Sequence, residues 1–373
     1  MQNQHTPVLI FAQNGRFLAQ SATQSGYRVW VADCFGDLDL IDSVERWQAL
    51  PPISELKPEQ IITLLSQLSN GEDCTLICGT GIENCFQFLQ NLPNNIKLIG
   101  NSPSVIKTIK TPSLFFTLLQ KFKLPYPETH LSLSTDTDTD TDSYITKSSS
   151  GFGGLHIQKM TSSSVSSSHY FQRIIDGESG SVLFLANGKE FQLLNINHQI
   201  LSPTLQSPFR LARIDAPWNI SANHLKILNS AIHNITAETA LVGLNSLDFI
   251  ISTKGDLFIL EINPRPSASA ELIDNDMLFK HHINACHGVL PSYSLPRADR
   301  LLSLKTIYAD HELTIPTAIN WPIYCRDIPH AKTIINEGEP IFTSFHDANS
   351  VKEIQALHQH TEQQVINQLS RST

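Results

Sequence analysis

The first hundred residues alternate between short apolar runs and amphipathic segments, and this alternation constrains the fold more than any other feature of the sequence. We predict buried strands in the apolar runs at 7–12, 27–33, 74–78 and 96–100. We predict helices in the segments at 14–26, 54–71 and 79–92. Apolar strands that alternate with helices are typical of a parallel sheet with helices on both faces. The sequence therefore predicts an N-terminal, doubly wound parallel α/β domain.

The composition narrows the class of protein. The chain has 373 residues, 41% of them hydrophobic, which suits two or three packed domains. Its net charge of −9 argues against a general binder of nucleic acid or anionic membranes, but allows one anionic ligand in a local basic pocket. We find no apolar run of the ~18–20 residues that span a membrane, and no secretion signal. The six cysteines form no Cys-x-x-Cys pair, so we expect free thiols in a reducing cytoplasm.

After residue 100 the pattern changes to separate groups of strands and helices, which indicates an α+β arrangement. A Leu- and Phe-rich helical segment over 101–127 ends at Leu-Pro-Tyr-Pro, because proline disfavours a helix. The Thr-Asp repeat at 135–142 has no apolar residue, so we expect a surface excursion there. Short strands continue to residue 214, and an amphipathic helix follows over 220–239.

Residues 245–267 carry the strongest local signal, a hairpin with Lys254-Gly255 at its turn. If these two residues form the whole loop, the opposite pairs are Asp248–Glu261, Ser246–Asn263 and Ile250–Ile259. Side chains alternate along a strand, so the two carboxylates and the Asn263 amide share one face. The other face is then apolar, with Leu247, Phe249, Ile251, Phe258, Leu260 and Ile262.

This polar face predicts a cation site. Two carboxylates directly opposite each other repel, so the pair of Asp248 and Glu261 calls for a compensating cation. Together with Asn263 they offer hard oxygen atoms, which suit Mg²⁺ bound along with substrate phosphates. Arg265 follows in Pro-Arg-Pro-Ser, where a guanidinium can grip phosphate or a developing negative charge. The structural alternative is an exposed hairpin with two solvated carboxylates.

Two further segments have features of a nucleotide site. Lys147 precedes Ser-Ser-Ser-Gly-Phe-Gly-Gly, whose backbone N–H groups could surround phosphates while the ammonium neutralises them. Residues 170–179 end a strand in Asp-Gly-Glu, where the backbone could bind an adenine and Glu178 a ribose. Taken singly, an ordinary turn explains each segment better.

In this order, the segments resemble the ATP-grasp superfamily over roughly residues 100–285. The resemblance rests on the helix that ends at Lys123-Leu124-Pro125-Tyr126-Pro127, a second lysine before a Gly-rich flap, a hinge, and a late Asp…Glu-x-Asn set. It implies an ATP-grasp fold preceded by the N-terminal α/β domain. The implied parts are 1–100, a small subdomain 101–180 with the flap 148–154, a large subdomain 181–290, and a C-terminal segment 291–373.

The resemblance also implies roles for single residues. Lys110 and Lys147 would contact ATP phosphates, with Lys107 as the competitor of Lys110, and Lys147 and Arg265 would act in catalysis. The other implied ATP contacts are Ser149, Gly151, Gly153 and Gly154 in the flap, Gln172, Arg173, Ile174 and Ile175 at the adenine, and Glu178 at the ribose. The implied metal ligands for two Mg²⁺ ions are Asp248, Glu261 and Asn263.

The resemblance also implies a function. ATP-grasp enzymes mostly join a carboxylate to an amine through an acyl phosphate and release ADP and phosphate. Within the family, the chain is similar to small ligases of one-carbon cofactor assembly, of the tyramine–glutamate ligase type. We expect small-molecule partners, neither nucleic acid nor membrane, and leave a homo-oligomer open. The alternative is a regulatory or assembly protein that binds nucleotide without turnover. An NAD enzyme is disfavoured, because Asn84 replaces the third glycine of a dinucleotide fingerprint.

Overall fold

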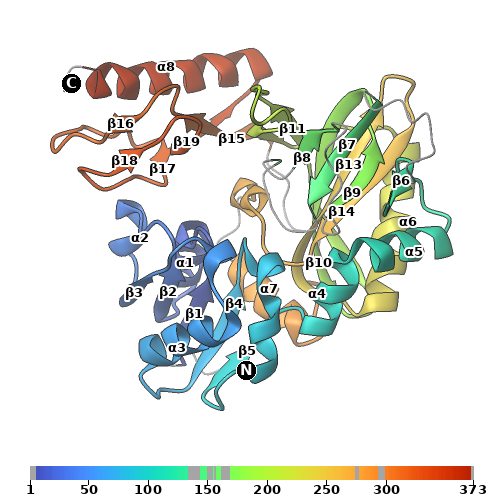
Figure 1. Ribbon diagram of the computed structural model, residues 1–373, viewed down its shortest axis with the longest axis horizontal. Coiled ribbons are helices and arrows are strands. Elements are labelled where there is room, and N and C mark those ends of the chain that lie inside the picture. The colour runs from blue at the N-terminus through green and yellow to red at the C-terminus, as the bar shows by residue number, and fades with distance from the viewer. Residues whose placement is uncertain are drawn as a thin grey trace.

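The computed structural model describes residues 6–132, 143–148, 154, 157–160, 169–273, 277–292 and 299–370. Its N-terminal part is a five-stranded sheet in the order β3-β2-β1-β4-β5, in which all neighbours are parallel (Figure 1). The strands are β1 (Val8–Phe11), β2 (Val29–Asp33), β3 (Arg46–Ala49), β4 (Cys74–Cys78) and β5 (Ile96–Leu98). The helices are α1 (Arg16–Gln24), α2 (Leu38–Ile41) and α3 (Pro58–Ser69). The predicted doubly wound domain is confirmed.

The segment predicted as one helix over 79–92 is different. It forms two 3₁₀ helices, Ile82–Asn84 and Phe86–Asn91. Gly81 has a φ of +101°, and its N–H donates to the Glu83 carboxylate at 3.0 Å. This local side-chain hydrogen bond competes with an α-helical first turn. The prediction of a helix there was wrong, and the turn instead fixes Glu83 at the carboxyl end of β4.

The helical segment before the small sheet is interrupted once. It forms α4 (Pro103–Lys110) and α5 (Pro112–Lys121). Thr111 between them is extended, because the proline ring that follows disfavours helical backbone at that position. Lys110 is therefore the last residue of α4, at the helix end that lies beside the large sheet (Figure 1).

Two antiparallel sheets follow. The small one has the order β6-β9-β7-β8, with β6 (Thr129–His130), β7 (Tyr144–Ser148), β8 (Ile157–Lys159) and β9 (His169–Arg173). The large one has the order β14-β13-β10-β11-β12-β15-β19-β17. Its first strands are β10 (Gly177–Asn187), β11 (Phe191–Leu201), β12 (Leu211–Ala216), β13 (Val242–Ser252) and β14 (Leu257–Asn263).

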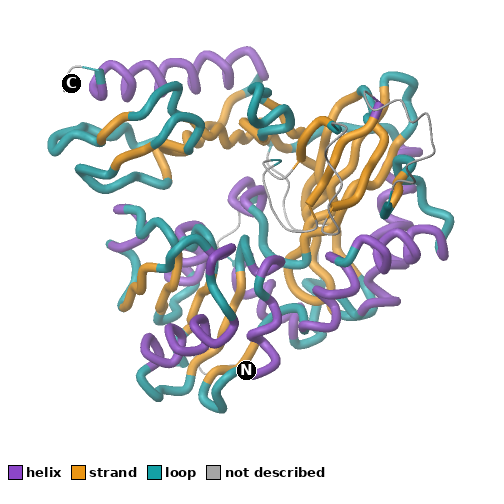
Figure 2. Tube along the Cα trace, viewed as in Figure 1, coloured by secondary structure: helices purple, strands orange, loops and turns teal. Residues whose placement is uncertain are grey.

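The C-terminal strands continue the same large sheet. These are β15 (Leu301–Tyr308), β17 (Cys325–Arg326) and β19 (Pro340–Ala348), while β16 (Leu313–Thr314) and β18 (Ile334–Ile335) form a separate pair. Helix α8 (Val351–Leu369) lies along them (Figure 2). Among the described residues, no helix combines the length and the apolar character needed to cross a membrane.

The main hydrophobic core lies on one face of the large sheet. Helix α6 (Ala222–Thr239) packs there, with Leu228 and Ile232 against Phe184 and Phe249. The opposite face carries α7 (Leu278–Cys286) and the short 3₁₀ helix Ala268–Leu272, which lie between the large sheet and the N-terminal domain (Figure 1).

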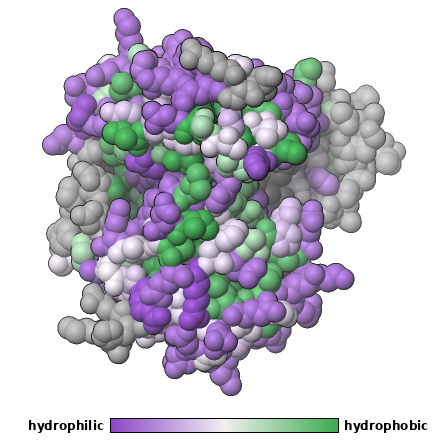
Figure 3. All heavy atoms as spheres, turned by 90° about the vertical axis from the view of Figure 1, so that its left-hand side faces the viewer, coloured by the Kyte–Doolittle hydropathy of each residue, from purple (hydrophilic) through white to green (hydrophobic). Residues whose placement is uncertain are grey.

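A buried arginine joins three parts of the chain. Arg16 is 3% exposed and binds both carboxylate oxygens of Glu271, at 2.9 and 2.6 Å, while its Nε donates to Asp327 at 2.7 Å. These contacts tie the N-terminal domain to the 3₁₀ helix Ala268–Leu272 and to the C-terminal segment. Figure 3 shows the molecule from the left-hand side of Figure 1, where hydrophobic residues interrupt a mostly hydrophilic surface.

Asp37 at this junction predicts a pH effect on stability. Burial, followed by the charges of Asp327, Asp33 and Asp39, raises the pKa of Asp37 to about 8. The folded chain thus prefers the protonated carboxyl, so stability falls as the pH rises from about 4 to 8. We expect Asp37→Asn, which cannot ionise, to be more stable than the parent by roughly 1–3 kcal/mol near pH 8 and equal to it near pH 4.

Denaturant unfolding at a series of pH values measures this difference. The exposed Asp42, at the end of α2, provides the control as Asp42→Asn. A constant offset between Asp37→Asn and the parent over the whole pH range would contradict the assignment.

Candidate active site

The candidate site surrounds the hairpin of β13 and β14, next to the end of α4 and to β7. In the hairpin, Asp248 pairs with Glu261 and Ser246 with Asn263, as the sequence predicts. The turn is longer than predicted, because Ser252 N–H donates to the Asp256 carbonyl at 2.8 Å and encloses three residues. Gly255 has a φ of +87°, which fits a three-residue turn with a left-handed glycine.

A bulge then restores the acidic pair. The register shifts between Asp248 and Phe249, so that Leu260 is the extra residue of β14. The predicted pair of Ile250 and Ile259 is therefore wrong, since Ile259 lies opposite Phe249. The predicted apolar face changes accordingly. Leu257 and Ile259 enter the core with Leu247, Phe249 and Ile262, whereas Phe258 and Leu260 are half-buried.

The acidic side chains are held by neighbouring amides. Asn263 Nδ2 donates to Asp248 Oδ2 at 3.2 Å, and Gln199 Nε2 donates to Asp248 Oδ1 at 3.3 Å. Burial, and then the negative charge of Glu261, raises the pKa of Asp248 above its ordinary value. The strands thus hold two carboxylates close together against their mutual repulsion and their loss of hydration. Such an arrangement is typical of a functional site.

Lys110 supplies a compensating cation. Its Nζ lies 3.0 Å from Glu261 Oε2 and 3.4 Å from Asn263 Oδ1, and its side chain is 9% exposed. Of the two lysines that compete for a phosphate role, Lys110 lies in the acidic cluster, whereas Lys107 is exposed. The ammonium thereby sits beside oxygens that would also suit a metal ion.

Lys147 approaches the same cluster from the small sheet. It lies on β7 and is 5% exposed. Burial lowers the pKa of Lys147, while the charges of Glu261 and Asp248 oppose this shift. A second ammonium therefore lies within electrostatic range of the acidic pair, where it can neutralise phosphate oxygens.

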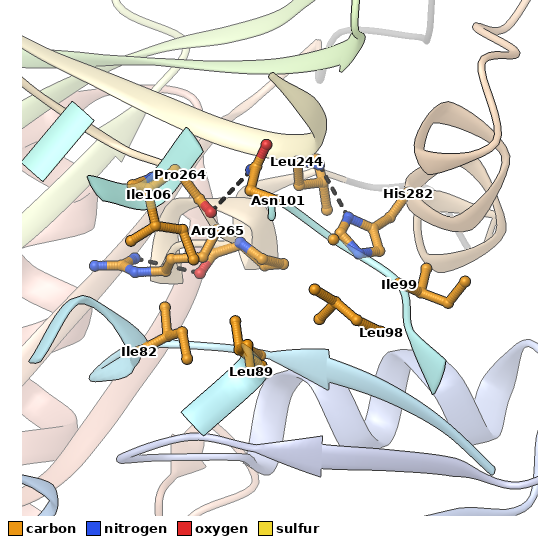
Figure 4. A pocket seen from close by; sticks show the side chains of 13 residues that line it. Ile82, Leu89, Leu98, Ile99, Asn101, Ile106, Leu244, Pro264, Arg265 and His282 are labelled. Atoms are coloured by element: carbon orange, nitrogen blue, oxygen red, sulfur yellow. Dashed lines mark hydrogen bonds between the residues drawn. The ribbon is translucent and has the colours of Figure 1, made fainter. Parts of the chain in front are cut away.

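Arg265 lies where the N-terminal domain meets the large sheet, beside a void of about 10 Å³ (Figure 4). Its backbone is fixed by Asn101, whose Nδ2 donates to the Pro264 carbonyl at 2.9 Å. Its Nη1 donates to the Pro266 carbonyl at 3.2 Å. The void has room for about one water, so it is too small for a substrate.

Glu83 is the partner of Arg265, and the sequence prediction missed it. Arg265 Nε donates to Glu83 Oε1 at 2.8 Å, and the side chains are 7% and 2% exposed. Glu83 follows a glycine turn at the end of β4, beside the point where the strand order of the sheet reverses. Doubly wound sheets bind ligands at that point, and this rule could have singled out Glu83.

The predicted adenine hinge follows the small sheet. Gln172 is buried, and its amide donates to Thr129 Oγ1 at 3.0 Å. Ile174 N–H donates to the Ser143 carbonyl at 2.8 Å, so this N–H is engaged within the protein. Beside the hinge lies a cavity of about 900 Å³, lined by residues that include Arg173, Ile174, Lys159 and Phe209. A cavity of this size can hold a nucleotide-sized ligand.

The structure does not bring Glu178 to the acidic pair. Along β10, Ser181 lies opposite Asp248, so Glu178 points to the other face of the sheet. Its carboxylate lies 3.8 Å from His198 Nε2, and the side chain is 67% exposed. By the same alternation, Ser179 is on the face of Asp248.

One residue of the flap is described. Gly154 has a φ of +79°, and a Cβ there would lie 1.9 Å from the Phe209 carbonyl oxygen, so only glycine fits. Ser149, Gly151 and Gly153 lie outside the described residues, as does the Thr-Asp repeat at 135–142.

The donor set fits a hard divalent cation. In the parts of the chain that the structure describes, no group of three or more His, Cys, Asp or Glu side chains could hold a metal. The candidate ligands are two carboxylates, Asp248 and Glu261, and the amide oxygen of Asn263. Such a small oxygen set suits Mg²⁺, which usually completes its shell with waters and substrate phosphates.

Solved structures share this architecture. An L-amino acid ligase from Bacillus licheniformis aligns with a TM-score of 0.71 and 15% identity, over 97% of this chain and 98% of the other. An N5-carboxyaminoimidazole synthetase from Staphylococcus aureus, complexed with ADP, aligns with a TM-score of 0.68 and 16% identity, over 96% and 100%. The biotin carboxylase domain of a Hydrogenobacter thermophilus 2-oxoglutarate carboxylase, in complex with MgADP, aligns with a TM-score of 0.71 and 13% identity. The alignment covers 93% of this chain and 87% of the other.

Sequence comparisons point the same way. A protein of Methanocaldococcus jannaschii, described as uncharacterized, is 23% identical over 90% of this chain and 86% of its own length. Residues 113–269 match the family model for the ATP-grasp domain. Residues 113–269 are thus identified as an ATP-grasp domain, within a chain that shares the fold of these solved structures.

Proposed function

We propose that this ATP-grasp protein is an enzyme, an ATP-dependent ligase that joins a carboxylate to an amine through an acyl phosphate. The observation that carries the proposal is the acidic pair of Asp248 and Glu261, with Lys110 in contact with Glu261. Lys147 and Arg265 add positive charge within electrostatic range of the pair. Phosphoryl transfer depends mainly on such charge stabilisation and positioning. The similar structures include a ligase, a synthetase and a carboxylase, two of them complexed with ADP.

The reaction would proceed in two steps. A substrate carboxylate oxygen attacks the γ-phosphorus of ATP and ADP leaves, after which the amine attacks the acyl carbon and phosphate leaves with loss of one amine proton. Mg²⁺, two ions in our proposal, would be held by Asp248, Glu261 and Asn263 and would offset the charge of the phosphates. Lys110 and Lys147 would bind phosphate oxygens, and Arg265 would stabilise the acyl phosphate.

The finer parts of the proposal rest on the sequence resemblance. We propose that residues 1–100, 101–180, 181–290 and 291–373 are the functional divisions of the chain. We also propose a cytoplasmic enzyme that acts in one-carbon cofactor biosynthesis. Tyramine and glutamate therefore belong in the first panel of acceptors.

Turnover is tested by phosphate release from Mg·ATP against panels of carboxylates and amines. We expect ADP and phosphate to form only when a matching carboxylate and amine are both present. Glu261→Ala should lower the rate by about 100-fold or more, because it removes a metal ligand and the partner of Lys110. Far-UV circular dichroism of the variant should match the parent.

Asp256→Asn, an exposed carboxylate in the turn of the same hairpin, is the matched control and should keep its rate. Full activity of Glu261→Ala would exclude the acidic pair as the metal site. Binding of ATP without hydrolysis across the panels would instead favour a protein without turnover.

Metal binding is tested separately by Asp248→Asn. The substitution keeps the size of the side chain but removes one of two opposed charges. We expect the parent to melt at a higher temperature in Mg·ADP than in ADP with EDTA, because a ligand that binds the folded state stabilises it. Asp248→Asn should lose this Mg²⁺-dependent gain and should not melt below the parent in EDTA. A gain equal to that of the parent would contradict the role of Asp248.

A further inference from the structure

Glu83 reaches the site from outside the matched ATP-grasp domain. It lies in the N-terminal domain, 182 positions before Arg265 in the sequence. Its Oε1 accepts from Arg265 Nε at 2.8 Å, and its Oε2 accepts from Gly81 N–H at 3.0 Å. Both carboxylate oxygens are therefore engaged, one by the site and one by the turn that carries the residue.

The burial of this pair points to a role beyond stability. A buried ion pair loses its hydration, and replacement by apolar residues is often neutral or stabilising. The junction already has a second ion pair, between the buried Arg16 and the partly buried Glu271, which also holds the N-terminal domain in place. Glu83 also lies in the field of the site, because burial raises its pKa while Arg265 and Lys110 lower it, with a net lowering.

The contacts of Arg265 define the orientation of its guanidinium. Nε is held by Glu83, and Nη1 is held by the Pro266 carbonyl at 3.2 Å. A planar guanidinium fixed at these two groups has a defined direction for its Nη2 edge. The backbone is fixed as well, since Asn101 binds the carbonyl of Pro264 (Figure 4).

We propose that Glu83 is a positioning residue, which orients Arg265 toward the phosphoryl group that leaves the acyl phosphate. The inference rests on the proposed function of Arg265. It makes the N-terminal domain part of the catalytic apparatus, because the carboxylate that aims the guanidinium comes from the end of β4. The anion that Arg265 would bind is phosphate, either attached to the substrate or released.

The test uses Glu83→Gln in the full chain, with two readouts. We expect kcat to fall by on the order of tenfold or more, while KM for ATP stays within about twofold. In the Mg·ADP complex, titration calorimetry should show inorganic phosphate binding weaker by a similar factor, with Mg·ADP affinity unchanged. A purely structural role would instead lower the melting temperature without this split.

A double-mutant cycle and a matched control complete the test. Once Arg265→Lys is present, adding Glu83→Gln should change phosphate affinity by less than about threefold, since the two residues act as a unit. Glu271→Gln breaks the other ion pair of the junction and should lower the melting temperature while phosphate affinity stays within about twofold.

The outcomes separate the two proposals. Phosphate affinity of Glu83→Gln within about twofold of the parent, or effects that add fully with Arg265→Lys, would overturn the positioning role. Absence of turnover in the parent would overturn the proposed function, while the phosphate titrations would still decide whether Glu83 aims Arg265.

Discussion

The opposition of two carboxylates on neighbouring strands is the constraint on which the site depends. Asp248 and Glu261 face each other in one row of the large sheet, and the sheet geometry prevents them from moving apart. Two lysines from other elements offset this negative charge, Lys110 at the end of α4 and Lys147 on the small sheet. Parts of the chain that are distant in sequence therefore meet at the acidic pair. A polyanionic substrate with its metal ion would replace the present contacts between the lysines and the carboxylates.

The N-terminal domain belongs to the same electrostatic system. Arg265 and Glu83 connect the end of the parallel sheet to the loop after β14, and Arg16 with Glu271 makes a parallel connection some distance away. The first link lies in the electrostatic field of Lys110 and Asp248. Because the junction contains two separate ion pairs, the positioning role proposed for Glu83 can be tested apart from the attachment of the domains to each other.

Much of the fold and part of the site could be predicted from the sequence. Apolar strands reveal the parallel sheet, and strand alternation places Asp248, Glu261 and Asn263 on one face. Strand β3 was missed because Arg46–Ala49 is a half-exposed edge strand with no apolar run. The pair of Glu83 and Arg265 leaves no periodic signal, because it depends on how two domains pack. The face of the sheet on which Glu178 lies could not be predicted either, because a shift of one residue along β10 moves a side chain to the other face.

The hairpin of β13 and β14 contains two irregularities that cancel. Its turn is one residue longer than a two-residue loop, which shifts the pairing by one residue. The bulge on β14, where Leu260 has no partner on β13, shifts the pairing back. With this turn and this chain length, a ladder without the bulge would place Leu260 opposite Asp248 and Glu261 opposite Leu247. The bulge is therefore what brings the two carboxylates onto one face of the sheet. A change that straightened the bulge without removing a residue would separate them.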